Sequence, residues 1–373
     1  MVKRTGFWVV FIGIVVFAAL AVLFSRLGGL VFDKPEAPSS SSTASSDRIE
    51  TVADGLEIPW EIAFTGNDRA LVTERPGRIR VVESGKLLSK PALTVQVTTS
   101  GEGGLMGLAV DPAYETNKFV YLFMTVSGTD KLVNRVVRYK DNGSELVEPQ
   151  TILDNIPGNR NHDGGRLAFG PDKLLYITTG DAQEPSLAQD KGSLAGKILR
   201  INTDGSVPAD NPFGNAVYSY GHRNPQGLAW DDKGQLYSTE HGPSGDRGLC
   251  CRDEFNEIKK GGNYGWPEVS GDEIRDGFVA PFLSSGSRDT WAPAGMAFAD
   301  GSFFFAELRG TKLHRLMRTS ENQHEEGRLL SNYGRLRAVV RGPDGNLYVS
   351  TSNRDGRGEP APADDRILKI KLK

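Results

Sequence analysis

The sequence predicts an all-β protein, a six-bladed β-propeller with four-stranded antiparallel blades, preceded by one N-terminal transmembrane helix. Two observations predict the propeller: one short phrase recurs six times, and glycine (44 residues) and proline (20 residues) are abundant, as in chains of short strands joined by turns. No stretch after residue 50 keeps a long apolar stripe at helical spacing. The transmembrane helix is predicted by the different composition of the first fifty residues.

The N-terminal segment begins with Lys3 and Arg4, followed by an apolar run from Gly6 to Phe24. Its nineteen residues are close to the roughly twenty that span a bilayer as a helix. We therefore expect residues 1–30 to be a membrane anchor or an uncleaved signal. Cleavage near Ala19-Leu20-Ala21 is the alternative, and it would release a secreted protein.

The basic N-terminus is expected to stay in the cytoplasm, which places the rest of the chain in the periplasm or at the cell surface. Residues 31–46 contain two prolines and a serine run, a composition typical of a flexible linker. Residues 47–373 are then expected to form the propeller as one catalytic domain.

The repeated phrase is a strand ending in small or apolar residues, an Asp- and Gly-rich turn, and a second, alternating strand. The copies lie about 55 residues apart on average, near the 40–50 residues of a four-stranded blade. A two-sheet sandwich would explain the alternation but not the repeat count. Because the ring must close, we expect the final strand, Arg366 to Leu372, to lie beside the first blade. The six copies begin at Ala63, Ala109, Ala168, Ala229, Ala297 and Val340.

The charge of the chain argues against nucleic acid as a partner. The formal net charge is −3, the pI is about 6.0, and lysine and arginine are scattered along the sequence. Such a chain offers no basic field that could follow a phosphate backbone.

Unusual polar and glycine-rich strings accompany the repeated strands, and equivalent loops of a ring converge on one face. We therefore expect a site built from several blades. The strings are Gly101–Gly107 (GEGGLMG), Asn161–Leu167 (NHDGGRL), Gly221–Gly227 (GHRNPQG), Glu240–Pro243 (EHGP), Asp253–Pro267 and Gly334–Arg337 (GRLR).

Several residues in these strings have chemistry suited to a site. His162 lies in a polar, glycine-flanked loop and is a candidate general base; an exposed turn histidine would look the same. Asp181 could orient its imidazole, although turn aspartates are common. Arg223 and Asn224, in a glycine-bounded loop, suit an anion, but a structural arginine is as frequent.

Two further strings suggest ligands. Arg335 and Arg337 lie two apart on an expected strand, so they share a face and could hold carboxylates, or form a plain surface pair. Gly101–Met106 differs from a dinucleotide-binding loop, because it lacks the last glycine and precedes a strand, so NAD is not expected.

The EHGP string has the features of a calcium site. The carbonyls of Gly242 and Pro243 could turn outward together, and Ca²⁺ readily takes backbone oxygens. Glu254 and the carbonyl of Tyr264 could supply further oxygens. Spacing alone does not decide between this site and an ordinary turn.

Taken together, the strings GHRNPQG, E-x-GP and GGNYGWP resemble those of the soluble quinoprotein sugar dehydrogenases, or glucose/sorbosone dehydrogenases. The resemblance runs from about Gly55 to the C-terminus. It implies a six-bladed propeller that uses pyrroloquinoline quinone (PQQ) and Ca²⁺ to oxidise the anomeric carbon of aldose sugars to lactones. An external electron acceptor would reoxidise the quinol.

The resemblance also implies roles for individual residues. His162 would remove the proton of the anomeric hydroxyl while hydride passes from C1 to the quinone. Asp181 would orient His162, and Arg223 would polarise the quinone carbonyl together with Ca²⁺. The implied cofactor-binding residues are Glu102, Asn161, Arg223, Asn224, Arg309, Arg335 and Arg337, and the implied calcium ligands are Gly242, Pro243, Glu254 and Tyr264.

Some positions depart from the family pattern. Glu102 stands where some members have glutamine, which adds a carboxylate near an acidic cofactor. Leu308 stands where a lysine is expected, with Arg309 beside it as a candidate substitute. The loops around Trp291–Gly295 look shortened, so specificity for glucose is not implied.

Two questions stay open at the level of sequence. Cys250 and Cys251 are the only cysteines; adjacent cysteines often remain unpaired, yet a vicinal disulfide is possible outside the cytoplasm. A propeller scaffold is also compatible with two other functions, a non-catalytic ligand-binding protein and a calcium-dependent six-bladed lactonase.

Overall fold

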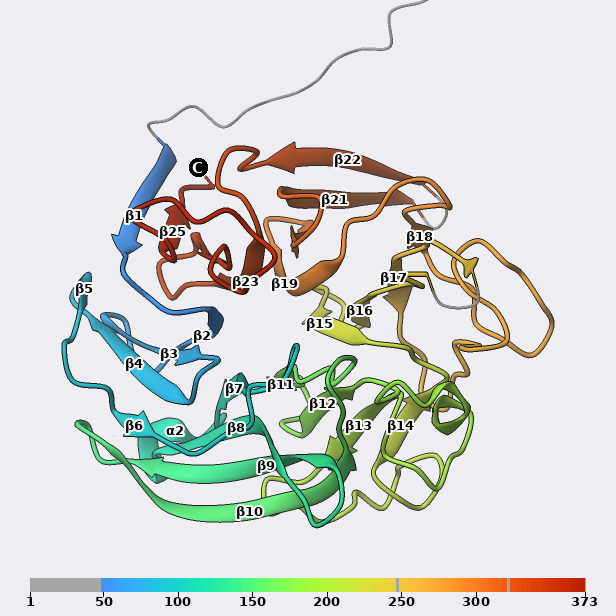
Figure 1. Ribbon diagram of the computed structural model, residues 1–373, viewed down its shortest axis with the longest axis horizontal. Coiled ribbons are helices and arrows are strands. Elements are labelled where there is room, and N and C mark those ends of the chain that lie inside the picture. The colour runs from blue at the N-terminus through green and yellow to red at the C-terminus, as the bar shows by residue number, and fades with distance from the viewer. Residues whose placement is uncertain (1–47, 246–247, 321–322, 373) are drawn as a thin grey trace, which may run out of the picture. The chain divides into compact units, whose positions relative to one another are not determined.

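The computed structural model describes residues 48–245, 248–320 and 323–372. The expected anchor and the whole of the expected linker therefore lie outside the described residues. Within those ranges, no helix is long and apolar enough to cross a membrane. The described chain forms six antiparallel sheets arranged as blades around a centre, which confirms the predicted six-bladed propeller (Figure 1).

Every blade except the last is built from consecutive strands. The first blade has five strands instead of the expected four, because β5 and β6 both pair with β4. The first three blades comprise β2 (Pro59–Phe64), β3 (Arg69–Glu74), β4 (Arg78–Glu83), β5 (Lys86–Leu87) and β6 (Leu93–Thr94); β7 (Leu105–Val110), β8 (Phe119–Ser127), β9 (Leu132–Asp141) and β10 (Leu146–Pro157); β11 (Leu167–Phe169), β12 (Leu175–Thr179), β13 (Lys197–Ile201) and β14 (Val217–Tyr220).

The second half of the ring has four strands in each blade. Helices are short: α2 (Tyr114–Asn117) and the 3₁₀ helix η2 (Pro185–Ala188) have four residues each. The strands of these blades are β15 (Pro225–Trp230), β16 (Leu236–Glu240), β17 (Glu254–Glu257) and β18 (Leu283–Ser284); β19 (Pro293–Ala299), β20 (Ser302–Glu307), β21 (Leu313–Ser320) and β22 (Gln323–Leu329); β23 (Leu336–Arg341), β24 (Leu347–Thr351), β25 (Ile367–Ile370) and β1 (Ile49–Ala53).

The repeated phrase marks the innermost hairpin of every blade. Its six copies begin within β2, β7, β11, β15, β19 and β23, and each of these strands contacts the next around the ring, with β23 contacting β2. Glycines allow this close approach: a Cβ at Gly107 would lie 2.1 Å from the Gly165 oxygen, and one at Gly227 would lie 2.5 Å from the Ala294 oxygen. Small residues in the phrase therefore reflect crowding at the centre of the ring.

The two ends of the described chain close the ring. β1 pairs antiparallel with β25, in a register that places Ile49 opposite Ile370 and Thr51 opposite Leu368. The closure expected from the final strand is confirmed, but β1 completes the last blade instead of β25 extending the first. β1 thereby covers the edge of β25 and becomes the outer strand of the last blade.

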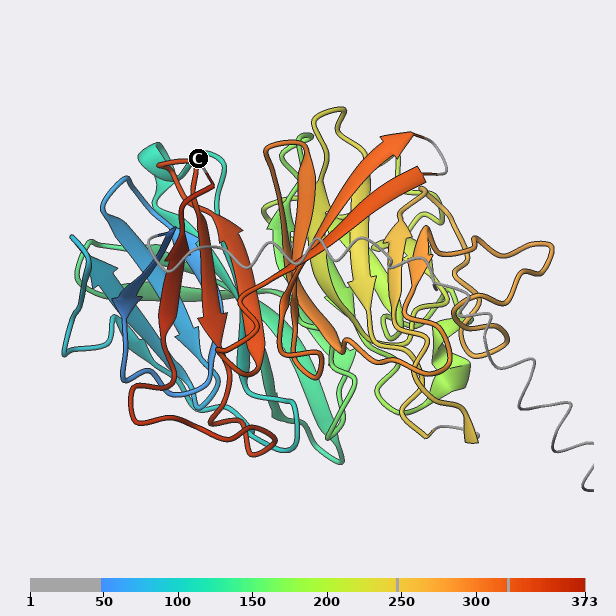
Figure 2. The ribbon, with the colours of Figure 1, turned by 90° about the horizontal axis from the view of Figure 1, so that it is seen from above.

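Apolar side chains fill the space between neighbouring blades, and polar ones collect at the centre. Fully buried Trp60, Tyr121 and Phe123 belong to one cluster shared by the first three blades. The first strands of all six blades line a central cavity of about 230 Å³, which contains Glu61 and Arg166. Figure 2 shows the blades side by side, in a view at 90° to that of Figure 1.

Candidate active site

His162 lies in the loop before β11 and is held by a buried acid from the same blade. Its Nδ1 is 2.7 Å from Oδ1 of Asp181, which follows β12 and has no exposed side-chain surface. The other carboxylate oxygen of Asp181 accepts a 2.7 Å hydrogen bond from Nε1 of Trp266. The two hydrogen bonds of Asp181 fix the plane of the imidazole. Because Nδ1 is bonded to Asp181, Nε2 is the ring nitrogen that can accept a proton.

The backbone at His162 is in the left-handed region, with φ of +64°. Its carbonyl accepts from the Ala182 N–H at 3.2 Å and lies where a Cβ at Gly180 would be only 2.0 Å away. A side chain at residue 180 would therefore push the His162 turn off the end of β12. Glycine at that position allows the turn to pack there.

The carboxylate of Glu102, in the loop before β7, is a meeting point of several blades. Oε2 accepts from the His162 N–H at 3.2 Å and from the side-chain amide of Asn224 at 3.3 Å. Burial alone would raise the pKa of Glu102, but the nearby His241, Arg357 and His162 lower it to about 2. The acid that departs from the family pattern is therefore ionised and held by several loops.

Arg357 is a site residue that the sequence analysis did not identify. Its guanidinium donates to Oε1 of Glu102 at 3.0 Å and to Oδ1 of Asn161 at 3.2 Å. The sequence could have indicated Arg357 through the string Ser352–Gly358 (SNRDGRG). This string lies at the end of the last repeat copy, as the other polar strings lie beside their own copies. Trp266 was missed in a similar way, although it lies inside the string that ends at Pro267.

Arg223 and Asn224, just before β15, lie together with these groups. Arg223 donates its backbone N–H to Glu240, its guanidinium contacts the His241 carbonyl at 3.3 Å, and it lies over the Trp266 ring at 5.4 Å. Asn224 accepts from the Gly164 N–H at 3.0 Å. Both predicted cofactor residues are therefore buried next to the His162 loop.

Arg335 and Arg337, at the start of β23, are buried rather than a surface pair. Arg335 contacts Asp355 at 2.8 Å, and Arg337 donates to Gln226 at 2.6 Å. Nε of Arg337 is buried without a hydrogen-bond partner among the described residues, and burial lowers the pKa of Arg337 to about 9. A buried guanidinium with unused donor capacity fits an anionic ligand such as a carboxylate.

Arg309 is not gathered with these residues. It lies exposed in the turn after β20, whereas its neighbour Leu308 is buried in the core. The Leu308 carbonyl accepts from the Arg335 guanidinium at 3.0 Å. The backbone of residue 308 therefore contacts the arginine pair. A contact between Arg309 and the cofactor stays a prediction.

The four predicted calcium residues line one small cavity of about 10 Å³, close to the volume that one water or ion requires. Residue 242 must be glycine because a side chain would not fit: a Cβ there would lie 2.0 Å from the Cys251 oxygen. The residues that line this cavity and bear on the prediction are Arg223, Glu240, Gly242, Pro243, Glu254 and Tyr264.

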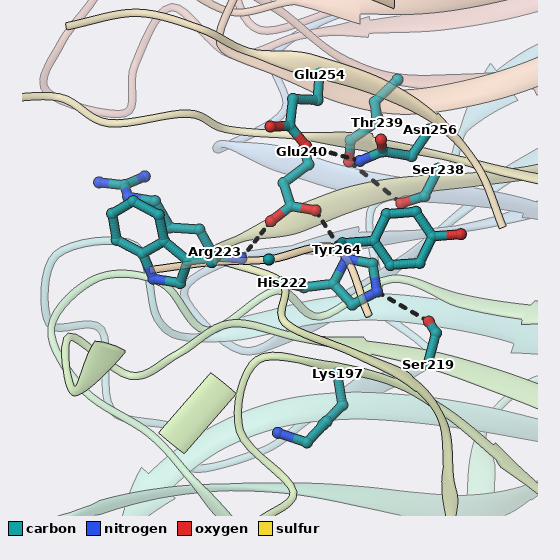
Figure 3. Close-up of polar contacts among 12 residues, drawn as sticks. Lys197, Ser219, His222, Arg223, Ser238, Thr239, Glu240, Glu254, Asn256 and Tyr264 are labelled. Atoms are coloured by element: carbon teal, nitrogen blue, oxygen red, sulfur yellow. Dashed lines mark hydrogen bonds and ion pairs between the residues drawn. The ribbon is translucent and has the colours of Figure 1, made fainter. Parts of the chain in front are cut away.

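Buried carboxylates beside this cavity favour a cation. Burial is the main cause, and the charge of Glu240 the next, that raises the pKa of Glu254 to about 8. Figure 3 shows Glu240 between Arg223 and His222, with Glu254 above it and Tyr264 beside His222. In the described parts of the chain no three His, Cys, Asp or Glu side chains form a metal cluster. A Ca²⁺ site formed by the carbonyls of Gly242, Pro243 and Tyr264 with Glu254 stays a prediction.

Cys250 and Cys251 form a disulfide in the structure. The Cys251 N–H donates to the Pro243 carbonyl at 3.0 Å, and both Cys251 and Arg252 have positive φ. The disulfide therefore lies directly against the predicted calcium carbonyls. Each carbonyl oxygen has two lone pairs, so Pro243 keeps one for a cation.

A model of the glucose/sorbosone dehydrogenase family matches residues 56–364. The chain is 32% identical over 342 residues to aldose sugar dehydrogenase YliI of Escherichia coli strain K12, covering 83% of this chain and 91% of that protein. It is 35% identical over 284 residues to quinoprotein glucose dehydrogenase B of Acinetobacter calcoaceticus, covering 66% of this chain and 58% of that one.

The fold also matches a solved structure in this group. The PQQ-bound form of aldose sugar dehydrogenase from Streptomyces coelicolor superposes with a TM-score of 0.79 at 41% identity, covering 87% of this chain and 97% of that one. Family model, sequence relatives and fold agree over most of the propeller. The chain belongs to the glucose/sorbosone dehydrogenase family.

Proposed function

We propose that this protein is a PQQ-dependent quinoprotein that oxidises the anomeric carbon of aldose sugars to lactones, with Ca²⁺ at the cofactor and an external electron acceptor. The observation that carries the proposal is the His162–Asp181 pair at 2.7 Å, in which buried Asp181 is bonded to Trp266, a residue that lines the predicted calcium cavity. The PQQ-bound Streptomyces relative supports the choice of cofactor.

His162 acts as the general base. With Nδ1 engaged by Asp181, Nε2 accepts the proton of the anomeric hydroxyl, and the buried carboxylate stabilises the imidazolium that forms. Trp266 keeps Asp181 in place by donating to its second oxygen. These residues remove the proton from the sugar hydroxyl as hydride leaves C1.

The remaining residues hold the cofactor. When bound, PQQ supplies the hydride acceptor, and Ca²⁺ polarises its reacting carbonyl. The buried guanidiniums of Arg335 and Arg337 suit carboxylates of the cofactor. Arg223 and Asn224 would contact the cofactor from the β15 side. The carbonyls of Gly242, Pro243 and Tyr264, together with Glu254, would hold the cation.

We also propose that residues 1–30 anchor the chain in a membrane and that the propeller lies on the extracytoplasmic side. The apolar run after Lys3 and Arg4 supports the anchor, and the Cys250–Cys251 disulfide supports an oxidising compartment. Fractionation of cells expressing the full chain, with protease added to intact spheroplasts, tests this. A propeller that is found in the cytosol or resists protease until lysis contradicts the proposed location.

Reconstitution tests the catalytic proposal. The purified protein is freed of metal, supplied with PQQ and Ca²⁺, and mixed with a panel of aldoses and an artificial electron-accepting dye. Dye reduction that requires the sugar, PQQ and Ca²⁺ together is the expected result. No dye reduction, with no quinone retained after desalting, would support the ligand-binding alternative, and lactone hydrolysis without quinone would support the lactonase.

A further inference from the structure

Arg357 joins the last blade to loops of the second and third blades. It lies in the connection between β24 and β25, whereas Glu102 precedes β7 and Asn161 precedes β11. One guanidinium nitrogen donates to Glu102 at 3.0 Å and the other to Asn161 at 3.2 Å. A single side chain thus connects three blades next to His162.

The ion pair differs from an ordinary surface pair in what its acid holds. The Arg357 side chain is 52% exposed, but that of Glu102 is only 13% exposed. The second oxygen of Glu102 accepts the backbone N–H of His162 at 3.2 Å. Since this carboxylate faces Arg357 on one oxygen and the histidine backbone on the other, the arginine fixes the orientation in which it can reach His162.

The His162 turn needs such external support. Its φ of +64° is uncommon for a residue with a β-carbon. The backbone N–H of the neighbouring Asn161 also donates to the side-chain oxygen of Gln183 at 3.3 Å. Arg357 therefore supports the turn on two sides, through the Asn161 side chain and through the Glu102 carboxylate. Residues in disfavoured conformations persist when their surroundings over-determine them.

We propose that Arg357 is a positioning residue, which acts through Glu102 and Asn161 to hold the turn that carries His162. The inference rests on the proposed function of His162 as the base. Its first test compares Arg357→Gln with Arg160→Gln, a control on an exposed arginine of the same turn. We expect Arg357→Gln to lower kcat about tenfold or more, with the aldose KM and the Kd for PQQ changed less than about twofold.

A double-mutant cycle tests whether Arg357 acts through Glu102. Glu102→Gln keeps an oxygen for the His162 N–H but removes the charge that pairs with Arg357. We expect the double variant Glu102→Gln, Arg357→Gln to have a kcat within about twofold of the lower single variant, since coupled residues are not additive. Arg357→Lys can pair with Glu102 but lacks the second guanidinium nitrogen that donates to Asn161. It should therefore be more active than Arg357→Gln and less active than the wild type.

A measurement without cofactor separates this inference from the proposed function. In the apo protein, amide hydrogen exchange of the segment around residues 158–165 should rise in Arg357→Gln and not in Arg160→Gln. If the wild-type protein oxidises no aldose, the proposed function fails, and this exchange experiment still tests the positioning role. Unchanged exchange with unchanged kcat, a weaker Kd for PQQ as the main effect, or additive kcat losses would each overturn the role of Arg357.

Discussion

At the scale of single residues, the orientation of His162 depends on Asp181 and Trp266. Asp181 has no exposed side-chain surface, and its two oxygens are divided between the imidazole and the indole at 2.7 Å each. An acid buried in this way has few alternative positions. It can therefore set both the tautomer of His162 and the plane of its ring.

Substitutions of the two residues that orient His162 should lower kcat by different amounts. Asp181→Asn keeps the shape but removes the charge that stabilises the imidazolium, so we expect kcat to fall by about 10²-fold or more. Trp266→Phe removes one hydrogen bond to Asp181 and should cost less. Steady-state kinetics with saturating PQQ and Ca²⁺ measures both. A larger loss in Trp266→Phe than in Asp181→Asn would contradict the proposed order of roles.

Loop composition singled out residues that the structure brings close together, but it did not predict the contacts of Arg357. His162, Asp181 and Arg223 stand in polar, glycine-flanked strings, which is a local property of the sequence. The contact of Arg357 with Glu102 joins residues 255 positions apart. Such a pairing depends on the register of the ring, which no local pattern contains.

At the scale of elements, the loop that follows Pro243 connects a disulfide to the predicted calcium carbonyls. The Cys251 N–H bonds the Pro243 oxygen at 3.0 Å, and the Cys251 oxygen occupies the space that a side chain at residue 242 would need. The disulfide bond links Cys251, which makes this contact, to Cys250, the residue before it. The position of the carbonyls is thus tied to the cysteine pair.

Removing the disulfide should therefore weaken calcium binding. We expect the double variant Cys250→Ser, Cys251→Ser to bind Ca²⁺ about tenfold more weakly, the lower end of the range for lost supporting contacts. Calorimetric titration of the apo protein measures this affinity, and mass measurement with and without reductant establishes whether the cysteines are paired. Equal calcium affinities in the wild type and the double variant would show that the cysteine pair does not position the carbonyls.

The fifth blade contains a buried histidine between two acids. His314, on β21, has no exposed side-chain surface and contacts Glu307 of β20 at 2.9 Å and Glu326 of β22 at 3.1 Å. Burial alone would lower the pKa of His314, but hydrogen bonds and charges of the two glutamates raise it above its ordinary value. The raised pKa means that the fold binds this proton more tightly than the unfolded chain does.

This cluster predicts a pH-dependent stability. The contribution of His314 protonation is fully present below its unfolded pKa of about 6.5 and is lost as pH rises through the raised folded value. We expect His314→Gln to lower the free energy of unfolding more at about pH 6 than at about pH 9, as measured by urea denaturation. A difference between wild type and variant that is the same at both pH values would contradict the protonated histidine.

At the scale of the whole molecule, the proposed function depends on ring closure. The predicted base, the arginine pair and the calcium carbonyls come from the third, sixth and fourth blades, respectively. β25 lies between β1 and β24 and joins the two ends of the described chain. Its residue Leu368 is fully buried in the cluster shared by the last two blades.

Weakening this junction should destabilise the entire propeller. We expect Leu368→Ala to lower the free energy of unfolding by about 2–5 kcal/mol, in a single transition, because a buried leucine is replaced by a cavity. Lys371→Ala, an exposed neighbour, is the control. Two separate denaturation transitions, with the last blade unfolding first, would show that closure does not hold the ring together.

The propeller and its six repeats were predictable because each blade repeats the same inner hairpin, in which crowding at the centre favours small residues. The fifth strand of the first blade was not, since β5 and β6 have only two residues each and carry no alternating pattern. The membership of β1 in the last blade was also hidden. Pairing between residues about 320 positions apart leaves no local signal.

The central claim is that the closed ring places His162 to take a proton while hydride leaves the sugar. It is tested most directly by rapid mixing of the PQQ- and Ca²⁺-loaded protein with an aldose and with the same aldose deuterated at C1. We predict reduction of the bound quinone with a primary isotope effect, and reduction about 10²–10⁴-fold slower in His162→Ala, which retains the quinone. Equally fast reduction in His162→Ala, or no isotope effect when the chemical step limits the rate, would contradict the account.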